Sequence, residues 1–323
     1  MIKAIGQGKA IVPTLKGRHF LKLADFTTEE IYWLLETAVQ LKKSQKQGKP
    51  QPYLNGKVLG MIFEKSSTRT RVSFEVGMLQ LGGHAIFLST KDIQLGRGET
   101  IADTAKVLSR YVDGIMIRTF GDERIEEFAS ASTVPVINGL TTLHHPAQVL
   151  ADLLTILEHK GKLKGLKLCY VGDGNNNMAH SLLEGAVKVG MNVSIASPKG
   201  YEPNQAIVSQ AKKDAKGTGS SIILTNDPSE AISGADVVVT DVWASMGMEG
   251  EAEERLAAFS SFQVNEELCS LAKNDFLFLH CLPAHRGEEV SAGIIDGPHS
   301  VVFDEAENRL HAQKAILKAL MED

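Results

Sequence analysis

Two patterns of hydrophobic and polar positions alternate along this chain. Short stretches such as 56–64, GKVLGMIFE, are almost continuously apolar, which predicts strands buried on both faces. Longer stretches such as 31–44, IYWLLETAVQLKKS, repeat apolar residues every three or four positions, which predicts amphipathic helices. Thr27 and Glu30 form a capping box before this helix. Because the two patterns follow one another throughout, the sequence predicts the α/β class, with parallel sheets covered by helices.

The alternation begins a second time after a long helical pattern at 145–161. We therefore expect two doubly wound parallel-sheet domains joined by interdomain helices. They span residues 1–150 and 151–300, and a last helix lies in 301–323. Segment 245–261 is polar and punctuated by glycines, and we expect a loop there that serves as a lid. The expected strands are 56–64, 84–89, 113–120, 134–140, 166–174, 192–198, 235–243 and 275–283.

The composition excludes several classes of protein. A chain of 323 residues with 43% hydrophobic and 23% charged residues has the balance of a globular protein with large cores. Its formal net charge of −5 disfavours a nucleic-acid or anionic-membrane surface, so any anion site must be a local pocket. The three cysteines lack CxxC spacing, which indicates neither a disulfide framework nor a structural zinc. With no signal-peptide pattern and no apolar run of membrane length, we expect a cytoplasmic protein.

The most polar cluster, SSTRTR at 66–71, lies between an expected strand and an expected helix. Free backbone N–H groups and the positive end of the helix dipole make such a position suitable for an anion. Ser67, Thr68 and Thr70 add hydroxyl groups, and Arg69 adds a planar guanidinium that matches phosphate oxygens. The alternative is a capped helix with solvated arginines. We favour phosphate binding, because a cap needs only one hydroxyl.

Two further polar positions follow strands of the same expected sheet. Arg118 ends the apolar run GIMIR, which predicts a charge at the carboxyl edge of the sheet, although it could pair with a structural carboxylate. Its position beyond the same sheet as the first cluster favours a role in the site. In LHHPAQ, His145 precedes Pro146 and should be extended, while Gln148 should lie in the first helical turn. A neutral histidine and a glutamine there could hydrogen-bond a carbonyl compound. The alternative is that His144 or His145 caps the helix or packs.

The second half contains a weak dinucleotide pattern. Gly172 and Gly174 follow a strand, but Asn177 stands where the third glycine of the fingerprint belongs. The asparagines of this segment are either ligand donors or residues of a tight turn. A nicotinamide-dependent dehydrogenase therefore remains a weak alternative. Asp241, at the end of another strand, could bind a cationic amine or could simply cap a helix.

The segment HCLPAHRGEEV raises the possibility of a metal site or a nucleophile. His280 and Cys281 are neighbours on an extended segment, so we expect them to point to opposite faces, which disfavours a shared metal with His285. Cys281 could act as a nucleophile, but the sequence shows no base beside it.

Taken in order, SSTRTR, HHPAQ, GDGNN, DVWASMG and HCLPAHRGEEV resemble the markers of the ornithine carbamoyltransferases, a branch of the aspartate/ornithine transcarbamoylase family. The resemblance covers nearly the whole chain. STRTR and HPxQ are shared across transcarbamoylases, whereas DVWASMG and HCLP point to the ornithine branch. One departure is Ala147, where many relatives have cysteine. Because a small residue is retained, we expect activity to be unaffected.

The resemblance implies two substrate sites, and a C-terminal helix in 301–323 that returns to the first domain. Residues implied for carbamoyl phosphate are Ser67, Thr68, Arg69, Thr70, Gln94, Arg118, His145, Pro146, Ala147, Gln148, Cys281, Leu282 and Arg309. Residues implied for ornithine are Asn176, Asp241, Ser245 and Met246. Those implied in catalysis are Arg69, Arg118, His145, Asp241 and Cys281.

The resemblance also implies the reaction and the assembly. The carbamoyl group would pass to the δ-amine of L-ornithine, giving citrulline and phosphate, without a metal, a cofactor or a covalent intermediate. The Gln94 loop would reach a neighbouring subunit's site, which implies a homotrimer or a multiple of one. The Leu282–Pro283 bond is expected to be cis. Two alternatives stay open: a transcarbamoylase acting on putrescine or aspartate, and a non-catalytic binding homologue.

Overall fold

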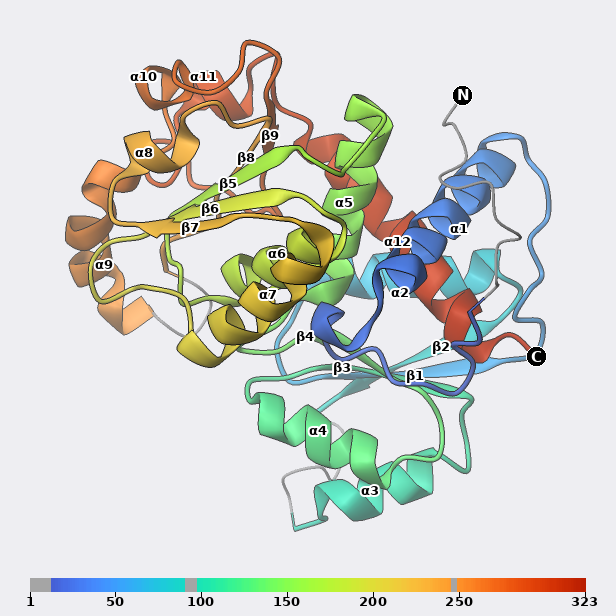
Figure 1. Ribbon diagram of the computed structural model, residues 1–323. Coiled ribbons are helices and arrows are strands. Elements are labelled where there is room, and N and C mark those ends of the chain that lie inside the picture. The colour runs from blue at the N-terminus through green and yellow to red at the C-terminus, as the bar shows by residue number, and fades with distance from the viewer. Residues whose placement is uncertain (1–12, 91–97, 245–248) are drawn as a thin grey trace.

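The computed structural model describes residues 13–90, 98–244 and 249–323. It contains two parallel sheets, one in each half of the chain (Figure 1). The first has the order β2-β1-β3-β4 and the second the order β7-β6-β5-β8-β9. The strands are β1 (Val58–Phe63), β2 (His84–Ser89), β3 (Gly114–Arg118), β4 (Val136–Leu140), β5 (Lys167–Val171), β6 (Asn192–Ala196), β7 (Ile222–Thr225), β8 (Val237–Val239) and β9 (Leu277–Leu279).

Helices connect the strands in both halves of the molecule. The α-helices are α1 (Thr28–Lys46), α2 (Thr68–Gln80), α3 (Ile101–Leu108), α4 (Asp122–Ala131), α5 (Pro146–Lys160), α6 (Asn177–Lys188), α7 (Gln205–Thr218), α8 (Pro228–Ile232), α9 (Ala252–Phe259), α10 (Glu266–Cys269), α11 (Ala292–Ile295) and α12 (Val302–Met321). The described residues also form the short 3-10 helices η1 (Leu23–Asp25), η2 (Glu249–Glu251) and η3 (Ser260–Phe262).

Each sheet is covered on both faces, as the sequence predicted. In Figure 1, α3 and α4 lie against one face of the first sheet, and α1, α2 and α12 lie against the other. Ile62, Ile117 and Phe128 belong to the core between this sheet and α3 and α4. The core on the opposite face runs on, through α5, into the second half of the chain. The two halves therefore share a hydrophobic core.

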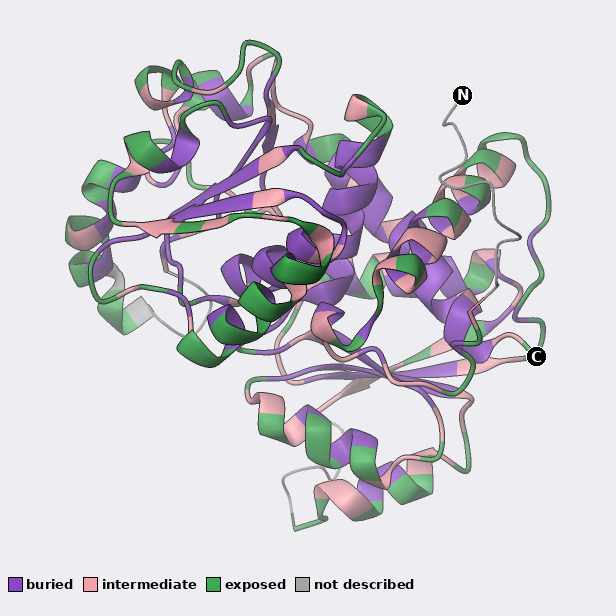
Figure 2. Cartoon of the chain, in the orientation of Figure 1, coloured by how far each residue is buried: buried purple, intermediate pink, exposed green. Residues whose placement is uncertain are grey.

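The two helices α5 and α12 pack against one another and connect the halves of the molecule. Every residue of α5 from Pro146 to Leu157 is buried, and Figure 2 shows this helix buried around almost its whole circumference. The last helix, α12, also packs against α1 and α2 of the first half. The predicted boundaries at residues 150 and 300 stay predictions; a boundary at 150 would cut α5.

The segment expected to be a loop at 245–261 contains structure that the sequence analysis did not anticipate. Within its described part, 249–261, α9 covers residues Ala252–Phe259. The run AEERLAA consists of strong helix formers, and this propensity outweighs the glycines that precede it. Among the described helices, none combines the length and the apolar character that a bilayer-spanning helix needs.

Candidate active site

The polar side chains gather where the strand order of each sheet reverses. In the first sheet, β1 and β3 are neighbours. The chain leaves β1 towards β2 on one side of this pair, and it leaves β3 towards β4 on the other side. In the second sheet, β5 and β8 are the corresponding neighbours. Crevices beyond the carboxyl ends of such strands are the usual ligand sites of doubly wound sheets. Arg118 ends β3 and Asp241 follows β8, as the sequence predicted.

The N-terminus of α2 is capped by the SSTRTR cluster. Ser67 has an extended backbone, and its Oγ accepts a hydrogen bond of 3.2 Å from the Thr70 N–H. The Thr70 hydroxyl, which is fully buried, also accepts a bond of 2.8 Å from the Arg309 guanidinium. Thr68 is the first residue of α2. The helix cap accounts for the hydroxyl of Ser67, and the hydroxyl of Thr70 binds Arg309 of α12.

Three guanidinium groups converge at this position. Arg118 and Arg309 are buried, and together with Arg69 they lie close enough to perturb one another electrostatically. The pKa of Arg118 and that of Arg309 are each lowered to about 10, first by burial, with the neighbouring arginines adding to the effect. In the described ranges none of the three forms an ion pair, and the Nε atom of each is buried without a partner. Such a cluster favours an anion strongly.

His145 lies beside these arginines in its neutral form. Burial lowers the pKa of His145 well below its ordinary value, and Arg309, Arg118 and Arg69 lower it further. Its N–H donates to Ser181 Oγ at 2.8 Å, and Pro146 opens α5, so the predicted helix start is confirmed. The backbone of His145, with φ −135° and ψ 62°, is not helical, but it is not the extended backbone that the sequence predicted. The ring Nδ1 is buried without a partner among the described residues. A neutral imidazole can donate a hydrogen bond to a substrate oxygen.

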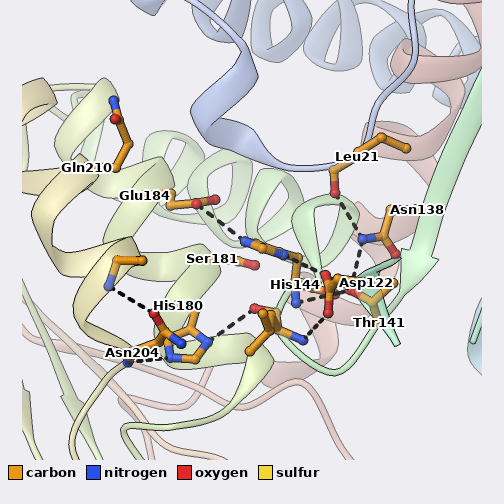
Figure 3. A network of polar contacts seen from close by, with 12 residues as sticks. Leu21, Asp122, Asn138, Thr141, His144, His180, Ser181, Glu184, Asn204 and Gln210 are labelled. Atoms are coloured by element: carbon orange, nitrogen blue, oxygen red, sulfur yellow. Dashed lines mark hydrogen bonds and ion pairs between the residues drawn. The ribbon is translucent and has the colours of Figure 1, made fainter. Parts of the chain in front are cut away.

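A second polar network surrounds the neighbouring residue, His144 (Figure 3). The His144 ring bonds Asp122 Oδ1 at 2.8 Å through Nδ1, and its Nε2 lies 3.4 Å from Glu184 Oε1. Although burial opposes the charged form, these carboxylates raise the pKa of His144 to about 9. His144 is therefore a buried imidazolium between α4 and α6. The sequence analysis offered only capping or packing for it, because its partners are distant in sequence.

A second group of polar side chains, from the second half of the chain, consists of Asp241, Cys281 and Asn176. The Cys281 thiol donates to Asp241 Oδ1 at 3.2 Å, and burial raises the pKa of both groups. A neutral thiol is a poor nucleophile, so this geometry does not support nucleophilic catalysis by Cys281. Asn176 Oδ1 caps α6 by accepting from the Ala179 N–H at 2.8 Å, and its Nδ2 donates to Tyr170 at 2.9 Å.

The HCLP segment connects the two halves of the site. The Leu282–Pro283 peptide bond is cis, as expected, and Leu282 has a φ of 57°. Left-handed backbone is unusual for leucine and marks a constrained position. The Leu282 carbonyl accepts a hydrogen bond from the Arg69 guanidinium, which brings α2 to the strand end after β9. Pro146 is buried and Ala147 is 1% exposed, both in the first turn of α5.

The expectation that His280 and Cys281 point apart is wrong. Ligand atoms of Asp241, His280 and Cys281 all lie within 4.8 Å of one another. The extended-strand argument failed because β9 ends at Leu279, so both residues lie beyond the strand. His280 nevertheless has both ring nitrogens engaged, one with the Leu282 N–H at 2.9 Å and one with Glu289 at 3.2 Å. It must give up one of these bonds to bind a metal.

The glycines of GDGNN serve the packing of the second half. Gly172 has a φ of 141°, which favours glycine. A Cβ at Gly174 would lie 2.8 Å from both the Tyr201 carbonyl oxygen and the Pro203 ring. Protein atoms thus fill the space in which a dinucleotide fingerprint admits a pyrophosphate. This geometry removes the support for a dehydrogenase.

Three of the predicted ligand residues, Gln94, Ser245 and Met246, lie outside the described residues. The structure also reveals buried charged groups that the sequence analysis did not single out. Asp173 pairs with Arg255 of α9, which also donates to the Trp243 carbonyl at 2.6 Å. Asp152 and Glu305 lie beside Gln148 between α5 and α12. Only helical spacing hinted at this second group, by placing Gln148 and Asp152 four residues apart.

Two family models match the chain. Residues 18–158 match the aspartate/ornithine carbamoyltransferase carbamoyl-P binding domain, and residues 164–320 match the Asp/Orn binding domain of the same family.

Full-length relatives are similar to the chain in sequence and structure. An ornithine carbamoyltransferase of Anoxybacillus flavithermus is 64% identical over 307 residues, covering 95% of this chain and 98% of that protein. That of Bacillus subtilis is 61% identical, covering 95% of each chain. The solved structure of ornithine carbamoyltransferase from Pyrococcus furiosus superposes with a TM-score of 0.93 at 57% identity, covering 96% of this chain and 99% of that one.

Proposed function

The chain belongs to the aspartate/ornithine carbamoyltransferase family, and from that premise we propose that it transfers the carbamoyl group of carbamoyl phosphate to the δ-amine of L-ornithine. The products are L-citrulline and phosphate. The observation that carries this proposal is the cluster of Arg69, Arg118 and Arg309, which has no carboxylate partner in the described part of the chain and adjoins neutral His145. Positive charge concentrated in a buried position is suited to a small, highly charged donor.

The phosphate of the donor binds at the N-terminus of α2. Free N–H groups of the first turn, the hydroxyls of Ser67 and Thr68, and the guanidinium of Arg69 supply the contacts. As the bond between the carbamoyl carbon and the phosphate oxygen breaks, negative charge grows on the leaving phosphate. The positive groups stabilise this charge more strongly in the transition state than in the bound donor, which accelerates the step.

The carbamoyl oxygen becomes negative when the amine attacks. Thr70, Arg118 and neutral His145 donate hydrogen bonds to it, in the manner of an oxyanion hole. Arg309 orients the Thr70 hydroxyl, since it donates to the oxygen and leaves the hydroxyl hydrogen free for the substrate. Gln148 accepts a hydrogen bond from the carbamoyl N–H. Pro146, Ala147, Cys281 and Leu282 line the same position.

The amine of ornithine is positioned by Asp241 and Cys281. It must lose a proton to solvent before it can attack, and it loses a second proton once the new C–N bond has formed. The leaving phosphate accepts that second proton. Asp241, whose Oδ1 accepts from the Cys281 thiol, orients the amine with its other carboxylate oxygen. Asn176, Ser245 and Met246 contact the rest of ornithine. Each proposed step uses protein groups and the two substrates, with no metal or cofactor.

The predicted division of labour and assembly belong to the same proposal. The first half of the chain, with helix 301–323 returned to it, binds carbamoyl phosphate, and residues 151–300 bind ornithine. Exposed Leu79 on α2 and Ile86 on the edge strand β2 support a homotrimer with the Gln94 loop at a neighbour's site, since apolar side chains on an open edge favour association. Sedimentation equilibrium should give three times the chain mass of 35.0 kDa, or a multiple of that value. We place the enzyme in the cytoplasm.

A substrate panel tests the reaction directly. The purified full chain is incubated with carbamoyl phosphate and, separately, L-ornithine, putrescine or L-aspartate, and the carbamoylated product and phosphate are both measured. We expect citrulline and phosphate in equal amounts with ornithine, at a kcat/KM at least a hundredfold above the other acceptors. A higher kcat/KM with putrescine or aspartate would show that this compound, and not ornithine, is the acceptor. No turnover with any of the three would indicate a non-catalytic binding homologue.

A further inference from the structure

A buried polar seam joins α5 to α12 immediately beside the proposed donor site. Its members are Gln148 and Asp152 on α5 and Glu305 on α12, and each is at most 1% exposed. Glu305 and Arg309 are four residues apart and lie on one face of α12, so the seam continues into the arginine cluster. Asp152 and Glu305 are not among the site residues that the family resemblance implies. These two carboxyl groups therefore need their own explanation.

The two carboxyl groups hold the nitrogen of Gln148 from both sides. Gln148 Nε2 donates to Asp152 Oδ1 at 2.8 Å and to Glu305 Oε1 at 2.9 Å. Glu305 is itself fixed, because its Oε2 accepts from the His280 N–H at 2.8 Å. Both amide hydrogens of Gln148 are thus used. Its Oε1 is buried and has no hydrogen-bond partner among the residues that the structure describes.

This arrangement permits only one orientation of the Gln148 amide. A glutamine amide can normally turn over, which exchanges its oxygen and its NH2 group. Here the turned amide would place its oxygen against two carboxyl groups and would leave the NH2 group without acceptors. Buried polar atoms left without partners are costly, so the amide is locked with its oxygen free.

The pair is built to remain in place at neutral pH. Burial raises the pKa of Asp152 to about 7, and burial followed by the nearby Asp152 raises the pKa of Glu305 well above its ordinary value. One proton between the two groups removes the repulsion of two adjacent negative charges. Each group still offers an oxygen to Gln148. The lock therefore does not require two buried carboxylates to be charged together.

We propose that Asp152 and Glu305 are positioning residues that lock the Gln148 amide with its oxygen towards the donor, so that the site selects a carbamoyl group by its N–H. This inference rests on the proposed function. A donor with a methyl group in place of the amino group, such as acetyl phosphate, presents no N–H to that oxygen. A site built to pair a polar group discriminates strongly against an analogue that lacks it. The lock therefore sets donor specificity rather than phosphate affinity.

The test compares carbamoyl phosphate, acetyl phosphate and inorganic phosphate as ligands of the full chain. In Asp152→Asn the new NH2 group can bond the Gln148 oxygen, which releases the lock. We expect the affinity for carbamoyl phosphate, measured by calorimetry, to fall about tenfold. The affinities for acetyl phosphate and inorganic phosphate should stay within about twofold of the wild-type values, because neither ligand uses that oxygen. Glu305→Gln should lower the same affinity, because Glu305 is the second acceptor of the Gln148 NH2 group. This variant replaces Asp152→Asn in the test if Asp152→Asn does not fold.

Asp304→Asn is the matched control. Asp304 precedes Glu305 on α12, is exposed and pairs with His159, so its loss should leave all three affinities unchanged. If the seam is merely structural, all three ligands will weaken together in the seam variants, which overturns the inference. Unchanged discrimination in a folded variant overturns it too. A wild type that makes citrulline but binds both acyl phosphates equally contradicts the inference alone, whereas one that makes no citrulline contradicts the proposed function as well.

Discussion

At the scale of single residues, the site depends on side chains whose protonation states are set by burial. Burial holds His145 neutral and the Cys281 thiol protonated, while Arg118 and Arg309, with pKa values of about 10, remain charged. This pattern suits a reaction in which an oxyanion and a phosphate must be stabilised and no nucleophile is supplied by the protein. Local motifs made His145 and Arg69 predictable, because a proline and a helix start fix their surroundings within a few residues.

Other residues could not be predicted, because their roles depend on long-range contacts. Arg309 reaches Thr70 across 239 positions, and Glu305 reaches Gln148 across 157. No local pattern brings these groups together; only the packing of α12 does. Arg309 entered the sequence analysis through the family resemblance alone, and Asp152 and Glu305 did not enter it. The prediction for His280 and Cys281 was wrong for a related reason, since strand periodicity did not show that β9 ends at Leu279, before both residues.

Asp241→Asn should mainly impair the use of ornithine. In the described residues, both hydrogen bonds to Asp241 end on Oδ1, from Cys281 and from the Val242 N–H. The variant keeps an oxygen for these donors but replaces the other carboxylate oxygen with an NH2 group facing the amine. We expect the KM for ornithine to rise, or kcat to fall, by at least tenfold. The affinity for carbamoyl phosphate should not change. An effect confined to carbamoyl phosphate would contradict the division between the two halves.

At the scale of secondary-structure elements, a residue at a helix N-terminus can stabilise the helix and can also bind a ligand. Ser67 at α2 and Thr100 at α3 both accept from the N–H three residues on, at 3.2 Å and 3.1 Å. Alanine at either position removes one cap and should lower the free energy of unfolding by about 1 kcal/mol. Denaturant unfolding measures this loss, and the two variants form a matched pair.

Activity should separate the two caps. Ser67→Ala should also raise the KM for carbamoyl phosphate severalfold, because the Ser67 hydroxyl belongs to the donor site. Thr100→Ala should leave the KM unchanged. Equal kinetic effects of the two variants would mean that α2 is only a capped helix, which is the alternative that its sequence left open.

At the scale of the whole molecule, buried polar networks join the halves. The His144 imidazolium pairs with Asp122 of α4 and Glu184 of α6, and Asp25 of η1 and His180 of α6 also interact with it electrostatically. The alternation of strand and helix patterns predicted both sheets. It could not predict such a network, whose members come from different elements.

The network makes stability depend on pH. Because the folded state raises the pKa of His144 from 6.5 to about 9, the stabilisation is fully present below pH 6.5 and is lost as the pH rises through 9. Its size is at most on the order of 3 kcal/mol. We expect the free energy of unfolding, measured between pH 6 and pH 10, to fall in the wild type and to fall less in His144→Gln. His159→Gln, which removes a more exposed histidine, should follow the wild type. Parallel curves for all three proteins would contradict the assignment of a buried imidazolium.

The account as a whole depends on the arginine cluster binding the donor, and isothermal titration with carbamoyl phosphate measures that most directly. Arg118 is buried, forms no ion pair in the described ranges and packs at the end of β3, so Arg118→Met keeps its apolar stem and removes only the charge. We predict that the wild type binds carbamoyl phosphate and that Arg118→Met, with its melting temperature preserved, binds it at least a hundredfold more weakly. Equal affinities for the two proteins would contradict the account.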